Sequence, residues 1–205
     1  IDRIVPKVAE SLFIAWAGTV IGAVFSFPVS FLAANNTSIN AISRGTKQIL
    51  NIIRAFPELI LAFVLLPVTG LGPLTGTLAV GIHSIGTLGK LSSEVIEGID
   101  EGPLESIKSS GGSKLNELFF GVVPQVMPTV TSYWLYRFEI NLRASAVLGI
   151  VGAGGVGAEL INQLRFRDFP RAGTVLVVTI LMVLIVDNIS AAIRRRIIKG
   201  RSIKI

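Results

Sequence analysis

Five long apolar stretches constrain this chain more than any other feature of its sequence. A membrane-spanning helix needs about 20 predominantly apolar residues, and each stretch is of that order. Backbone groups inside a bilayer must bond to one another, and the stretches lack the alternating pattern of a membrane β-barrel. We therefore predict an all-α membrane protein, a polytopic bundle of about five spans in a single domain over residues 1–205. The expected spans are residues 8–34, 49–68, 74–95, 126–151 and 174–193.

The composition supports a membrane protein. Hydrophobic residues make up 51% of the chain and charged residues 16%, whereas about a quarter of a soluble domain is charged. There is no cysteine and one histidine, so neither a disulfide framework nor a multi-histidine metal site is expected. The net charge of +6 does not indicate nucleic-acid binding, because basic residues crowd directly after the last apolar stretch, as in a cytoplasmic tail. They are Arg194, Arg195, Arg196, Lys199, Arg201 and Lys204.

Basic residues in the short connections predict the orientation of the spans. Cytoplasmic connections carry an excess of Lys and Arg, so the connections after the first and third spans are expected inside with the C-terminal tail. Residues 69–73 and 152–171 are then outside, and the first span begins outside. A chain that begins outside at Ile1 is expected to have a further helix upstream. The basic residues of the two inner connections are Arg44, Lys47, Lys108 and Lys114.

The connection between the third and fourth spans, about residues 100–124, is polar and broken by glycine. The glycine pair that begins at Gly111 is expected to end a first short helix, and Ser113 can cap a second. Connections longer than about 12–15 residues are uncommon without a function. The spacing from Glu105 through Gly111 to Pro124 resembles the coupling loop of ATP-binding-cassette (ABC) importer permeases.

That resemblance implies that ATPase subunits dock on this connection and that their movement passes into the membrane helices. The chain departs from the usual loop at Ser106 and Ile107, where many importers have two alanines. It departs again at Gly121 and Val123, where isoleucine and leucine are usual. Small and apolar side chains can still fill a groove, so the same role is expected. The expected docking residues are Leu104, Glu105, Ser106, Ile107, Gly111, Gly112, Ser113 and Leu115.

Three charged residues, Arg137, Glu139 and Arg143, fall inside the expected fourth span. Each costs ~2.5–3.5 kcal/mol at the centre of a membrane helix unless it is paired or wetted. Glu139 and Arg143 are four residues apart, so we predict an ion pair on one helix face. Arg137 lies on another face and needs a different partner or a watery cavity. Two interpretations stay open and are compatible: an ion-pair network that joins helices, and a pathway lining for an anionic solute.

The segment YRFEINLRASAVLGIVGAGGVG, residues 136–157, carries a more specific resemblance. With residues 52–60 and 79–100, it is similar to phosphonate-type ABC permeases, whose pattern is close to RFEINLRAS-x-VLG-x-VGAGG-x-G. The resemblance covers essentially the whole chain. It implies a subunit of a bacterial inner membrane that forms a homodimer with a second copy of itself. Two ABC ATPase subunits and an external solute-binding protein would be its other partners, beside membrane lipid.

Other residues of the expected spans are further candidates for a pathway or a gate. His83 and Ser84 could donate hydrogen bonds to an oxyanion, although a structural interhelical histidine is the alternative. Tyr133 and Tyr136 share the charged helix, although membrane tyrosines often serve as interface anchors. The complete expected pathway set is His83, Ser84, Tyr133, Tyr136, Arg137, Glu139, Arg143 and Ser145.

Two nucleotide-binding patterns bear on the function of this chain. Residues 152–157 fit the glycine pattern of dinucleotide-binding loops, which needs a preceding strand. Here a membrane span precedes it, so close helix packing or a gate hinge is favoured. The chain contains no P-loop sequence. ATP and Mg²⁺ are therefore expected on the ATPase subunit, with no cofactor and no catalytic residue in this chain.

Together these features predict the permease subunit of an importer for phosphonate or a related phosphorus oxyanion, such as phosphite or phosphate. One alternative is an importer of the same build for another solute, such as methionine. The other is an ATP-independent channel or secondary transporter. Secondary transporters often contain inverted repeats, and none is visible in this sequence.

Overall fold

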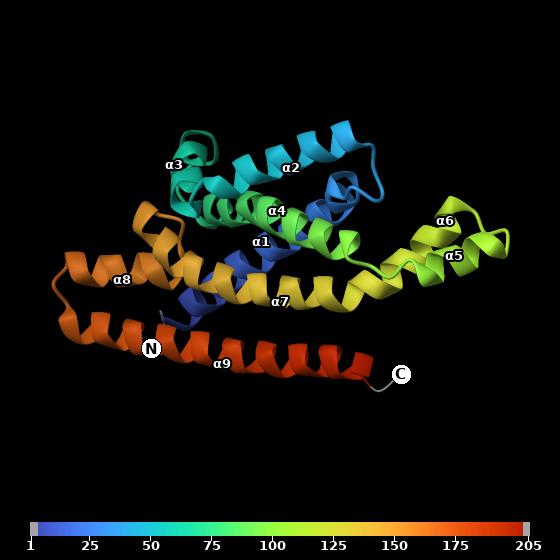
Figure 1. Cartoon of the computed structure of the whole chain (residues 1–205). Coiled ribbons are helices and arrows are strands. Elements are labelled where there is room, and N and C mark those ends of the chain that lie inside the picture. The colour runs from blue at the N-terminus through green and yellow to red at the C-terminus, as the bar shows by residue number, and fades with distance from the viewer. Residues whose placement is uncertain (1–3, 203–205) are drawn as a thin grey trace.

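The computed structural model describes residues 4–202, with side chains for residues 4–198, and its described part is helical without strands (Figure 1). This confirms the predicted all-α fold. The longer helices are α1 (Ile4–Ala33), α2 (Asn40–Ala55), α3 (Glu58–Thr69), α4 (Pro73–Glu97), α7 (Val123–Leu148) and α9 (Phe169–Ser202). The shorter ones are α5 (Gly102–Ser109), α6 (Lys114–Asn116), a π-helical turn (Glu117–Val122), a 3-10 turn (Gly149–Val151) and α8 (Gly155–Arg165).

Helices α1 and α4 approach each other closely because glycine removes side chains from their interface. A Cβ atom at Gly18 would lie 2.4 Å from the Val80 side chain, and one at Gly22 would lie 2.4 Å from Ser84 Cβ. Small residues allow such close approach in membranes, where packing rather than exclusion of water holds helices together. Helix α4 also packs against α2, α3 and α7 and is thus the centre of the bundle.

Two single helices, α1 and α9, are long and apolar enough to cross a membrane. The number rises to four if two bent pairs, α2 with α3 and residues 114–151 with α8, each count as one span. The expected third span lies on α4, which is 25 residues long but rich in glycine, serine and threonine. Its neighbours shield α4 from lipid, so it does not need the apolar surface that the peripheral α9 exposes.

The expected second span, residues 49–68, is not one continuous helix. Helices α2 and α3 are separate and are bent by 87° relative to each other. Pro57 stands in the break, and a proline disfavours a helical backbone at the residue before it. That residue, Phe56, is extended, with φ and ψ of −80° and 121°. Pro28 and Pro67, by contrast, lie inside helices without ending them.

The connections gather at two opposite ends of the bundle. Figure 1 shows the α1–α2 connection, α5, α6 and the C-terminal end of α9 at one end. The start of α1, helix α3 and helix α8 lie at the other end. The predicted orientation requires this grouping, because it assigns the basic connections and the tail to one side.

The glycine-rich segment after α7 bends the chain by 40° and packs α8 against α7. Gly152 and Gly154 have φ values of +78° and +83°, which favour glycine. A Cβ atom at Gly157 would lie 1.9 Å from the Ala146 carbonyl oxygen. A helix rather than a strand precedes the segment. The dinucleotide interpretation therefore lacks its structural context, and close packing explains the glycines.

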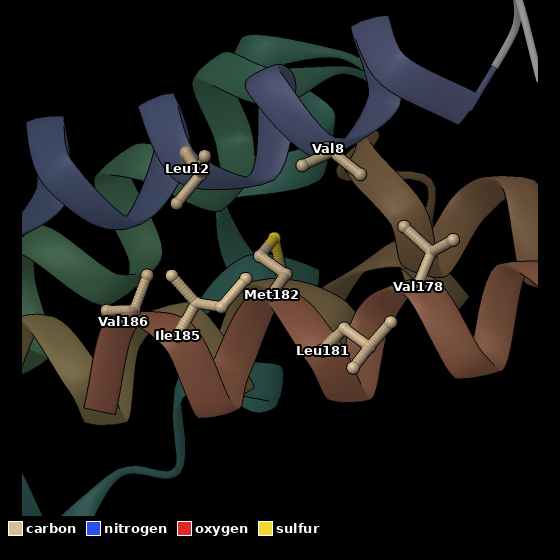
Figure 2. A pocket seen from close by; sticks show the side chains of 7 residues that line it. All are labelled: Val8, Leu12, Val178, Leu181, Met182, Ile185 and Val186. Atoms are coloured by element: carbon tan, nitrogen blue, oxygen red, sulfur yellow. The ribbon is translucent and has the colours of Figure 1, made fainter. Parts of the chain in front are cut away.

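An apolar groove separates part of α1 from α9 (Figure 2). Its side chains point into the gap from both helices, and all are aliphatic or methionine. The groove offers no polar group to a charged solute. It is lined by Val8, Leu12, Val178, Leu181, Met182, Ile185 and Val186.

Candidate functional sites

Arg137 lies on α7 at the centre of a buried polar network, with a side chain only 5% exposed. Its Nε donates to Ser84 Oγ on α4 at 2.9 Å, and its Nη2 donates to Glu58 Oε1 on α3 at 2.9 Å. His83 Nδ1 contacts the same Nη2 and lies 3.1 Å from Glu58 Oε1. The additional partner that the sequence required for Arg137 is therefore a carboxylate from another helix.

Uncharged polar side chains hold Ser84 in place. Asn141 Nδ2 donates to Ser84 Oγ at 3.1 Å and to Thr19 Oγ1 at 2.8 Å. Thr19 Oγ1 donates in turn to the Ala15 carbonyl oxygen at 2.6 Å. Ser84 and Asn141 are fully buried. The network thus joins α1, α4 and α7, and it fixes Arg137 from its Nε side.

Glu58 was not among the expected site residues, although it completes this network. It begins α3, directly after the break at Pro57, and its side chain is 23% exposed. Its signal was present in the sequence, because an acidic residue inside an expected span is costly and is often functional. Asn141 and Thr19 carried no comparable signal, since uncharged polar residues are common in membrane helices.

The predicted ion pair between Glu139 and Arg143 is wrong. Glu139 Oε1 instead lies 2.9 Å from Arg194 Nη2, and Arg143 pairs with Asp187. Helix α9 runs antiparallel beside α7 (Figure 1), so it places opposite charges next to both residues. Each pair therefore forms across two helices rather than along one. These contacts support the interpretation in which Glu139 and Arg143 attach one helix to another.

The remaining pathway candidates lie apart from Arg137. Tyr133 and Tyr136 line an open hollow between α7 and α9 together with Arg194. The Arg194 guanidinium carbon lies 5.5 Å from the centre of the Tyr136 ring, a cation–π contact. Ser145 is buried, and its Oγ donates to the Leu142 carbonyl oxygen of its own helix at 2.8 Å. The structure brings His83, Ser84 and Arg137 together. The other candidates face α9 or, in the case of Ser145, bond within their own helix.

The coupling segment, residues 102–122, has the predicted two-helix form. Helix α5 ends before Gly111, whose φ of +80° favours glycine. Ser113 Oγ then accepts a hydrogen bond from the Asn116 backbone N–H at 3.3 Å, and this confirms the predicted cap of α6. Helix α6 continues through the π-helical turn into α7 without an intervening loop. The coupling segment is therefore joined directly to the helix that carries Arg137.

The first helix of the coupling segment packs against the π-helical turn. A Cβ atom at Gly121 would lie 3.2 Å from the Leu104 side chain and 3.3 Å from that of Ile107. The departure from the usual loop pattern at Gly121 thus leaves room for these two residues. Gln125 also bonds to both backbone groups of Asp100, at 3.0 and 3.1 Å. Leu104 and Ile107, expected to dock on a partner, face inward and hold the segment's shape.

The outer face of the coupling segment exposes large apolar side chains. Leu115 is 66% exposed, Phe119 62% and Phe120 73%. Phe120 also lines a shallow hollow with Ser106, one of the expected docking residues. Clustered exposed apolar residues mark interaction surfaces. The two phenylalanines were missed because, in the sequence, they cannot be distinguished from lipid-facing residues of a helix that enters the membrane.

Nothing in residues 4–202 offers a metal site. Groups of three or more His, Asp or Glu side chains suited to a metal ion do not occur there. Glu58 and His83 are close to each other, but the Arg137 guanidinium beside them would repel a cation.

Comparison with known proteins identifies close relatives over nearly the whole chain. The phosphite transport system permease protein PtxC of Stutzerimonas stutzeri is 40% identical over 187 residues, which cover 91% of this chain and 68% of PtxC. The phosphate-import permease protein PhnE of Mycolicibacterium smegmatis is 41% identical over 191 residues, which cover 93% of this chain. This match spans only 36% of that PhnE.

The fold also matches a solved structure described as an inward-facing conformation of the MetNI methionine ABC transporter. The TM-score is 0.81 with 21% sequence identity, and the match covers 94% of this chain and 95% of that chain. At this identity the likeness shows the fold alone. The binding-protein-dependent transport system inner membrane component family matches residues 26–199, which is most of the sequence. This chain belongs to that family, the inner-membrane components of binding-protein-dependent transport systems.

Proposed function

We propose that this chain is the permease subunit of an ABC importer for phosphite, phosphonate or phosphate in a bacterial inner membrane. Relatives named for phosphite and phosphate transport are 40% and 41% identical, whereas the methionine transporter supports only the fold. In the proposed assembly, a second copy completes the pathway and an external binding protein delivers the solute. Two ATPase subunits bind the coupling segments and carry the ATP and Mg²⁺.

The single observation that carries this proposal is the continuous path from the coupling segment to Arg137. The exposed apolar residues at one end of the bundle lie on α6 and the π-helical turn. The turn continues directly into α7, which carries Arg137. Movement of an ATPase bound to Leu115, Phe119 and Phe120 would therefore reach a buried cation through one helix. The docking surface in this proposal also includes Glu105, Ser106 and Ser113. Gly111 and Gly112 shape the turn beside it.

The Arg137 network supplies groups suited to a phosphorus oxyanion. Arginine forms strong charge-assisted bonds to such anions, often through two N–H groups at once. The His83 ring adds a neighbouring hydrogen-bonding group, and the Ser84 hydroxyl holds the Arg137 Nε in place. In this proposal Tyr133 and Tyr136 are gate candidates, whereas Glu139, Arg143 and Ser145 keep α7 in place.

The proposed orientation has the coupling segment and the end of α9 in the cytoplasm. The chain has no native cysteine, so single cysteines report sidedness cleanly. In intact cells, a membrane-impermeant thiol reagent should label Leu71→Cys and spare Ser110→Cys. The reverse labelling would overturn the orientation.

Uptake by the complete transporter tests the function. The permease would be reconstituted in proteoliposomes with its ATPase subunits, and labelled phosphite, phosphate, methylphosphonate and methionine would be offered with the binding protein. We expect ATP-dependent uptake of at least one phosphorus oxyanion and none of methionine. Methionine uptake would identify the alternative importer, and oxyanion flux without ATP would identify a channel or secondary transporter.

A further inference from the structure

We propose that the Glu58 carboxylate mimics the transported anion and competes with it for Arg137. It pairs with Arg137 while the transport pathway holds no solute, and an arriving phosphorus oxyanion displaces it. This inference rests on the proposed function and adds a binding site to it, with a residue of the chain itself as the competing ligand. The site consists of Arg137 and His83, with Ser84 holding Arg137 in place, and its occupant in this structure is Glu58.

The anion-binding side of the site is held firmly. Arg137 is buried, and its Nε is tied to Ser84, which Asn141 fixes in turn. The Nη2 group points the other way, toward Glu58 and His83. A guanidinium that is fixed on one side can exchange its counter-ion on the other without losing its position.

The carboxylate side is held much less firmly. Glu58 begins α3, a helix of 12 residues in which only Ala62 is buried. The break at Pro57 precedes α3, and two glycines with φ of +74° and +144°, Gly70 and Gly72, follow it. Helix α3 is therefore a short element with a turn at each end. It can carry Glu58 away from Arg137 while the rest of the network stays in place.

The geometry of the pair favours exchange. Arg137 and His83 both contact the same carboxylate oxygen, Glu58 Oε1, so the Arg137–Glu58 ion pair is not bidentate. A phosphorus oxyanion has several oxygens and could bond Arg137 and His83 separately. A buried arginine without a counter-charge is strongly disfavoured. Departure of Glu58 therefore requires arrival of another anion. Without such an anion, Glu58 stays paired with Arg137.

Binding measurements on the assembled permease–ATPase complex in nanodiscs, without binding protein, test the inference. The probes are inorganic phosphite and inorganic phosphate. Because Glu58→Gln removes the competing charge, it should bind one of these probes roughly tenfold or more tightly than the wild type. The double variant Glu58→Gln with Arg137→Gln should lose that gain. Unchanged binding in the single variant, or equal binding in the double variant, would overturn the proposal.

Thermal stability provides a second readout if Glu58→Gln assembles poorly. The probe anion or formate should then raise the Tm of Glu58→Gln and leave that of the double variant unchanged. If neither anion raises the Tm of Glu58→Gln, the proposed competition between Glu58 and the anion is wrong. Glu10→Gln is the matched control, since it removes a carboxylate from the Lys7 pair on α1, and it should gain no anion affinity. Oxyanion uptake by the wild-type complex tests the proposed importer function separately. If the wild type takes up the oxyanion but Glu58→Gln does not bind it more tightly, only the inference about Glu58 is rejected.

Discussion

Helix α7 carries two charged regions, and they differ in what faces them. Arg137 meets Glu58 on α3, a short helix with one buried residue and a turn at each end. Glu139 and Arg143 meet α9, a long neighbouring helix, at two separate points. Charged side chains within two helical turns of α7 thus face two different kinds of partner helix. We propose that the pairs with α9, a long helix attached at two points, fix α7, whereas the pair with the short helix α3 can open.

Burial separates Arg137 from Arg143, but not from Glu139, whose side chain is also 5% exposed. The Arg137 side chain is 5% exposed, whereas that of Arg143 is 49% exposed. Removing one partner of a buried charge pair is costly because a charge is left without compensation. Pairs that are largely exposed contribute only about 0–1 kcal/mol. Substitutions at Arg137 and at Arg143 should therefore differ in both size and kind.

The largest effect is expected from Arg137→Gln. Glutamine can still bond Ser84, so the complex should assemble, but the charged partner for an oxyanion is gone. ATP-dependent oxyanion uptake should fall roughly tenfold or more, since a hydrogen bond to a charged group contributes about 1.5–3 kcal/mol. The matched variant Arg143→Gln should retain uptake within about twofold, as expected for a weak exposed pair. Equal losses in the two variants would remove the distinction between the regions.

A smaller effect, on stability rather than transport, is expected from Glu139→Gln. It leaves Arg194 without its partner at a site where Glu139 is nearly buried. The destabilisation should be about 1–3 kcal/mol, read as a lower Tm of the purified permease. Adding Arg194→Gln should restore much of the loss, because neither charge is then unpaired. Strictly additive changes in Tm would show that the two residues do not interact.

The smallest effect is expected at the second contact with α9. The double variant Arg143→Gln with Asp187→Asn removes a pair in which the arginine is half exposed. Stability should change by less than about 1 kcal/mol, and uptake should be unaffected. A large loss of uptake would move Arg143 from the attachment region to the solute pathway.

The coupling segment could be predicted in detail because its signals are local. A glycine that ends a helix and a serine that caps the next act within a few residues, and both occur as predicted, at Gly111 and Ser113. The charge partners could not be predicted, because they are remote in sequence. Glu58 and Arg137 are 79 residues apart, and the pairing depends on the 87° bend that brings α3 beside α7. Helical spacing alone favoured a Glu139–Arg143 pair, and the neighbouring α9 provided closer partners.

The central claim is that force applied at the coupling segment reaches Arg137 through α7. Stimulation of ATP hydrolysis by the solute-loaded binding protein, measured on reconstituted Gly111→Val, tests it most directly. A β-branched residue is strained at φ of +80°, so the turn should be distorted although the side chain has room. Gly173→Val is the matched control, because Gly173 also has open space but no positive φ. The account predicts that Gly111→Val retains basal hydrolysis but loses stimulation and uptake, while Gly173→Val keeps both. Normal stimulation and uptake in Gly111→Val would contradict it.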